Sequence, residues 1–81
     1  MIDDLTRIIA LHIVRYLLEH PAAADTVEGV HFVWVGADLA CNPLDSTLAA
    51  LELLSEQGLV ACVPIGNRLL WRAWRDSSAQ R

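Results

Sequence analysis

Lysine is absent from the 81-residue sequence, so all six of its basic side chains other than histidine are arginine. Ten aspartates and glutamates outnumber them, which gives a net charge of −4. Nucleic-acid affinity depends largely on neutralising phosphates with lysine and arginine. The charge balance therefore counts against a general affinity for nucleic acids, and the distribution of the arginines matters more than their number.

Cysteine is scarce, and its spacing argues against a metal site. Cys41 and Cys62 form no Cys-x-x-Cys pair, and no histidine lies at ligand spacing from either of them. A structural zinc site needs four closely grouped ligands. We therefore expect two free thiols, buried or half-buried, and neither a metal ion nor another cofactor.

A long apolar run is also missing. The longest apolar stretch, Leu5 to Leu18, is interrupted by Thr6, Arg7, His12 and Arg15. This stretch is too short and too polar to span a bilayer. The acidic start of the chain at Asp3 and Asp4 has the wrong sign for a secretory signal. These features predict a soluble, cytoplasmic protein with no membrane association.

Catalytic motifs are lacking as well. His12, His20 and His31 are isolated, without a nucleophile at a convincing spacing, and no glycine-rich phosphate loop is present. Glu52 and Glu56 are four residues apart, a spacing more typical of an exposed helix face than of a metal pair. We expect neither an enzyme nor a small-molecule substrate.

Apolar residues are plentiful: 54% of the sequence is hydrophobic, and the mean hydropathy is +0.36. The length allows a single domain, which we place at residues 1–75, followed by a frayed polar tail at 76–81. A chain this short buries only about 60–65% of the surface of its unfolded form. The remaining apolar surface suggests a homodimer.

The first helix is expected to run from a cap at Asp3 or Asp4 to about Glu19, because proline at position 21 disfavours a helical residue before it. Its apolar arc is wider than one core needs. We therefore predict that Ile9 and Ile13 contact a second subunit. Trp74 is a further interface candidate, since tryptophan is enriched at interface anchors.

Residues 22–35 carry conflicting signals. Val30, Phe32 and the residues up to Val35 favour a strand. The run Asp25-Thr26-Val27-Glu28 has the form of a capping box, and Val27, Val30, Val33 and Trp34 recur at helical spacing. We favour a short helix over 26–35, with a strand as the alternative.

The rest of the chain gives clearer signals. A third helix is predicted from Pro43 or Leu44 to Gln57, with Gly58 in the left-handed conformation that ends helices. Gly66-Asn67 then separates two β-prone runs, which indicates a hairpin from about Val60 to Trp74. Pro64 must lie at an edge or near the turn.

This order of elements resembles the winged helix-turn-helix superfamily. The resemblance is carried by Leu48-Ala49-Ala50-Leu51-Glu52-Leu53-Leu54-Ser55-Glu56-Gln57-Gly58-Leu59-Val60, which is similar to the end of the recognition helix in many small bacterial regulators. The stretch 25–30 also resembles small bacterial proteins of this organisation. The resemblance implies an α+β fold with three helices and a C-terminal two-stranded β-hairpin wing.

It also implies a DNA-binding transcriptional regulator that places the third helix in the major groove of double-stranded DNA. Asn42 and Ser46, near the start of that helix, are the side chains suited to base edges. Arg68, Arg72 and Arg75, in or just after the wing, are the candidates for phosphate contacts. The third helix itself carries acidic residues and no arginine. The alternative is a winged-helix module for protein interaction or dimerisation that does not bind nucleic acid.

Overall fold

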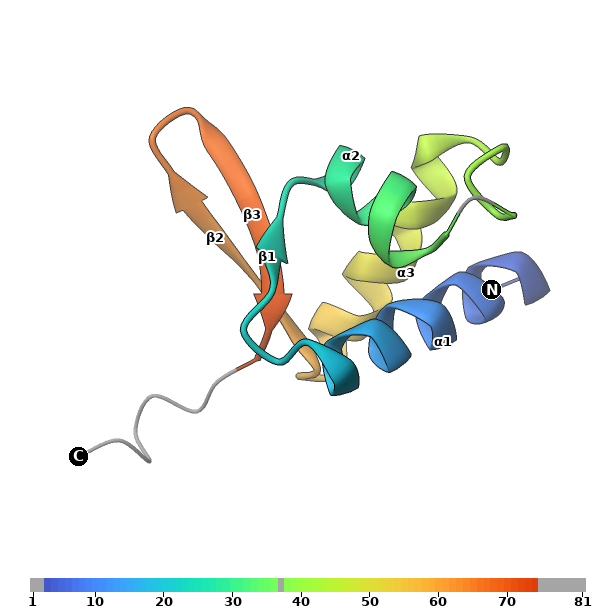
Figure 1. Cartoon of the computed structure of the whole chain (residues 1–81), viewed down its shortest axis with the longest axis horizontal. Coiled ribbons are helices and arrows are strands. Elements are labelled where there is room, and N and C mark those ends of the chain that lie inside the picture. The colour runs from blue at the N-terminus through green and yellow to red at the C-terminus, as the bar shows by residue number, and fades with distance from the viewer. Residues whose placement is uncertain (1–2, 37, 75–81) are drawn as a thin grey trace.

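The computed structural model describes residues 3–36 and 38–74, and Figure 1 shows the arrangement of its elements. The helices are α1 (Asp4–Glu19), α2 (Val27–Gly29) with the π-helical segment η1 (Val30–Trp34) directly after it, and α3 (Leu44–Glu56). The strands are β1 (Ala24–Asp25), β2 (Val60–Ile65) and β3 (Arg68–Ala73). The predicted α+β class is confirmed. Arg75 and the proposed tail at 76–81 lie outside the described residues.

Helix α1 begins and ends where the sequence predicted. Asp3 is its N-cap: the Thr6 backbone N–H donates to Asp3 Oδ1 at 2.8 Å. The side chain of Thr6 and, after it, this backbone N–H lower the pKa of the Asp3 carboxyl, because hydrogen bonds to the carboxylate stabilise the charged form. His20 closes the other end by donating its backbone N–H to the Tyr16 carbonyl.

The segment after β1 is helical, so the strand alternative for residues 26–35 is wrong. Its cap is Thr26, whose hydroxyl accepts from the Gly29 N–H at 3.3 Å, while Asp25 Oδ1 accepts from the Thr26 N–H at 2.8 Å. The helix then widens into η1, where the Val35 N–H donates to the Val30 carbonyl. This wider turn shifts the buried face: Val33, predicted to join the apolar stripe, is exposed, and Val35 is buried instead.

The sheet is the main departure from the predicted layout. It has three strands in the order β1-β3-β2, both pairings antiparallel, where only a two-stranded hairpin was expected. Strand β1 pairs Ala24 with Arg72 and Asp25 with Trp71. A two-residue strand whose partner lies more than 40 positions away leaves no periodic signal in the sequence.

The hairpin itself is confirmed. Ile65 pairs with Arg68 across Gly66-Asn67, and Gly66 has a φ of 60°, as a turn with glycine at its first central position requires. Pro64 lies on β2, an edge strand, opposite Leu69. Gly58 ends α3 with a φ of 76°, also as predicted.

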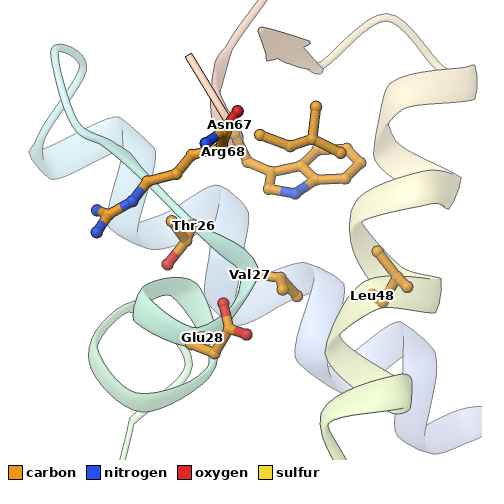
Figure 2. A pocket seen from close by; sticks show the side chains of 8 residues that line it. Thr26, Val27, Glu28, Leu48, Asn67 and Arg68 are labelled. Carbon is orange, nitrogen blue, oxygen red and sulfur yellow. The ribbon is translucent and has the colours of Figure 1, made fainter. Parts of the chain in front are cut away.

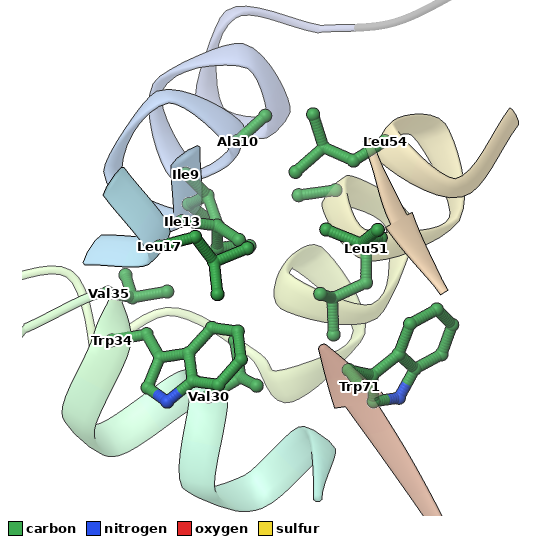
Figure 3. Packing of buried hydrophobic residues seen from close by; sticks show 12 residues of the cluster. Ile9, Ala10, Ile13, Leu17, Val30, Trp34, Val35, Leu51, Leu54 and Trp71 are labelled. Carbon is green, nitrogen blue, oxygen red and sulfur yellow. The ribbon is translucent and has the colours of Figure 1, made fainter. Parts of the chain in front are cut away.

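The core lies where α1, η1, α3 and the base of the hairpin meet (Figure 3). Its fully buried side chains include Ile9, Ile13, Val30, Leu51 and Val60. Burying a side chain of this size stabilises the fold by about 1.5–3 kcal/mol. The hairpin extends away from this core in Figure 1, and it contributes the buried Val60 and Trp71 and the partly buried Ala73.

Candidate interaction surfaces

The outer face of α3 is acidic. Asp45, Ala49, Glu52 and Glu56 are all exposed and recur at intervals of four, three and four residues, so they form one continuous stripe. No lysine or arginine occurs between Leu44 and Glu56. A helix with this face would bring three carboxylates toward the phosphates of any duplex whose groove it entered.

The two predicted base-reading side chains lie at the start of α3, and both are half-buried. The Asn42 side-chain amide donates to the Leu39 carbonyl at 3.0 Å, which ties it to its own loop. Ser46 donates its backbone N–H to the Pro43 carbonyl in the first turn of the helix. Asn42 would have to break a local hydrogen bond before its amide could donate to a base.

Of the three predicted arginines, the structure describes Arg68 and Arg72, and these two have different surroundings. Arg68 is exposed at the tip of the hairpin. Arg72 is half-buried, and its Nε is a buried atom that finds no hydrogen-bond acceptor among residues 3–36 and 38–74. Arg75 lies outside the described residues.

Arg68 instead borders a hollow of about 570 Å³ between the hairpin, the start of α2 and α3 (Figure 2). Thr26, Glu28 and Arg68 lie on one side of it and Leu48 on the other. Val27, Asn67, Leu69 and Trp71 complete the lining. Because Glu28 and Arg68 have opposite charges, the hollow offers no concentrated positive charge to a phosphate.

Two of the predicted interface residues are in the wrong place for that role. Ile9 and Ile13 have 0% of their surface exposed and pack inside the core, so they cannot contact a second subunit without unfolding. The apolar arc of α1 is wide, and the sequence does not show which part of it the rest of the chain covers. Trp74, the third candidate, is 54% exposed, and its interface role stays a prediction.

The exposed apolar surface of α1 belongs to other residues. Leu11 is 63% exposed, Leu18 77% and Ile8 44%. Beside this surface, two apolar hollows of about 450 and 280 Å³ share Val14 and Leu59. Exposed apolar surface of this extent on a small domain marks an interaction site more often than a single exposed leucine does.

His31 is a buried polar residue whose role the sequence did not reveal. The Ala40 carbonyl can only accept, so Nε2 of the ring donates to it at 2.9 Å. Nδ1, on the other side of the ring, forms a hydrogen bond with the Thr47 hydroxyl at 2.6 Å. His31 therefore ties η1 to both the following loop and α3, and this role is structural.

The cysteines differ from expectation in their burial. Cys41 and Cys62 are free thiols, but both are exposed rather than buried. Within the described part of the chain, no three His, Cys, Asp or Glu side chains cluster in a way that could hold a metal ion. No helix among those residues combines the length and apolar character needed to cross a membrane.

The chain matches no protein-family model, no curated protein and no solved structure.

Proposed function

We propose that this chain is a winged-helix-type interaction module that pairs with a second copy of itself and does not bind nucleic acid. The order of α1, α2, α3 and a hairpin supports the winged-helix assignment, and β1 adds a strand to the hairpin without changing that order. A fold does not determine a function, so the function is inferred from the chemistry of the exposed surfaces.

The observation that carries the proposal is the contrast between two surfaces. The face of α3 that a DNA-binding winged helix would place in the groove bears Asp45, Glu52 and Glu56. The outer surface of α1 instead exposes large apolar side chains, led by Leu11 and Leu18. Apolar burial is the main favourable term in protein association, whereas phosphate neutralisation dominates DNA affinity.

Binding to double-stranded DNA is the second candidate function. It is favoured by one observation, the exposed Arg68 at the tip of the hairpin beside Asn67. In that case the hairpin, rather than α3, would supply the phosphate contacts.

Two measurements on the full chain separate these candidates. Titration of fluorescently labelled mixed-sequence duplex DNA at 20 mM and 150 mM salt should show no binding at either concentration. Light scattering coupled to size exclusion should give a dimer mass at high micromolar concentration. Tight binding at low salt that weakens steeply at 150 mM, and is lost in Arg68→Ala, would replace this proposal with the DNA-binding one. A monomer mass at every concentration would remove the self-association.

A further inference from the structure

The outermost stripe of α1 has an ordered sequence of charges and apolar groups. Asp4, Ile8, Leu11 and Arg15 are all exposed, and they recur at intervals of four, three and four residues. This is the spacing of the contact seam between paired helices. The buried residues of α1, such as Ile9 and Ile13, lie on the opposite side of the helix, so the stripe faces away from the core.

These four residues are complementary to the same four residues in the opposite direction. Read backwards, the stripe runs from basic through two apolar residues to acidic. An antiparallel partner helix of the same sequence would therefore place Arg15 opposite Asp4, and Leu11 opposite Ile8. A parallel partner would instead place Asp4 against Asp4 and Arg15 against Arg15.

Asp4 and Arg15 cannot form an ion pair within one copy of the chain. They are eleven residues apart on a continuous helix, which separates their Cα atoms by about 16 Å along the axis. Ile8 and Leu11, between them, are 44% and 63% exposed. Pairing of two copies would cover both apolar side chains and bring the opposite charges together.

We infer that a second copy of this chain docks antiparallel on the stripe Asp4, Ile8, Leu11 and Arg15 of α1. The two-fold symmetry of such a pair forms the Asp4–Arg15 contact twice and the Ile8–Leu11 contact twice. Leu11 also lines the hollow of about 450 Å³ between α1 and the end of α3, which leaves room beside the seam for side chains of the partner. This inference rests on the proposed self-association and adds its surface and orientation.

Charge exchange tests it directly. Asp4→Arg and Arg15→Asp should each weaken the dimer about tenfold, since each creates two like-charged contacts across the pair. The double variant Asp4→Arg/Arg15→Asp should restore the wild-type dissociation constant, measured by sedimentation equilibrium. Leu11→Glu should give a monomer, whereas Leu69→Glu, which changes a similarly exposed leucine on the hairpin, should leave the dimer intact.

The design also guards against an effect on helix stability. The double variant places an arginine in the first turn of α1, where a positive charge is unfavourable to the helix dipole, so a restored dimer cannot result from a more stable helix. Far-ultraviolet circular dichroism of every variant checks that it is folded. A wild-type dimer that the single exchanges leave unchanged would overturn the stripe and retain the proposed function. A wild-type monomer would overturn both.

Discussion

At the scale of single residues, the small core contains polar side chains that are as fully buried as its apolar ones. His31 is 2% exposed and Thr47 0% exposed, so water cannot reach them, and the two side chains hydrogen-bond to each other instead. A buried polar group that loses its partner costs about 1–3 kcal/mol, which is a large share of the stability of a small domain. The His31–Thr47 pair is therefore a point where a small chemical change should have a large effect.

Thr47→Val tests this pair. Valine has nearly the shape of threonine but no hydroxyl, so Nδ1 of His31 would lose its hydrogen-bond partner. We expect the free energy of unfolding to fall by about 1–3 kcal/mol in urea denaturation. In the His31→Leu background the same substitution should cost much less, because the imidazole that bonds to the Thr47 hydroxyl is already absent. Equal costs in the two backgrounds would contradict the coupling.

The N-cap residue Asp3 makes the stability of the fold depend on pH. Its pKa is lowered in the folded chain by hydrogen bonds with the side chain and the backbone N–H of Thr6, so the stabilisation is complete above the ordinary carboxyl pKa. It is lost as the pH falls below that value and through the folded pKa. Thermal unfolding at pH 6 and pH 3 should therefore show a smaller decrease in melting temperature for Asp3→Asn than for wild type, since asparagine can cap without ionising. Identical decreases would show that the Asp3 cap does not contribute.

At the scale of the elements, the start of α2 depends on close approach. A Cβ on Gly29 would overlap the carboxyl group of Asp25, which holds the Thr26 N–H. Helix propensity alone predicts that Gly29→Ala stabilises by about 1 kcal/mol. We expect it to destabilise by about 1 kcal/mol instead, since Asp25 must move away from its hydrogen bond. Chemical denaturation gives the sign.

The matching control removes the obstacle. In an Asp25→Ala background, Gly29→Ala should become neutral or stabilising, because the carboxyl group that it would meet is gone. Destabilisation of the same size in both backgrounds would mean that the overlap with Asp25 is not the cause.

The elements that were predicted correctly are those specified by nearby residues. Helix α1 has its N-cap Asp3 beside it, α3 has its apolar stripe and the terminating Gly58, and Gly66-Asn67 lies between the two strands that it joins. Strand β1 depends on pairing with a distant segment, and η1 depends on a change of helical pitch that shifts which valines are buried. Neither leaves a local pattern.

At the scale of the whole molecule, the surfaces were harder to predict than the fold. The acidic face of α3 follows from its spacing, and the structure exposes those carboxylates. The burial of Ile9 and Ile13, and the exposure of Cys41 and Cys62, depend on which neighbours cover each side chain. Only tertiary packing determines that.

The three tryptophans should report this packing. Trp34 and Trp71 are buried, whereas Trp74 is 54% exposed. Acrylamide should therefore quench one accessible class of fluorescence, which Trp74→Phe removes while Trp71→Phe leaves it. Equal accessibility of all three in the native protein would contradict the core as described.

Pro64 has a consequence for how copies of this protein can meet. It has no N–H to donate. The pair Ile65–Arg68 closes the two-residue turn as a hydrogen-bonded pair, so the next pair, Pro64–Leu69, is the non-hydrogen-bonded kind, and the backbone of Pro64 faces the free edge of β2. A strand of another molecule that paired along this edge would lack one backbone donor on β2, the N–H that Pro64 does not have. Edge-to-edge pairing of molecules into a continuous sheet is thereby hindered at β2, although more than half of the chain is hydrophobic. The proposed pairing through the side chains of α1 differs in kind, because a two-fold pair closes and stops growing.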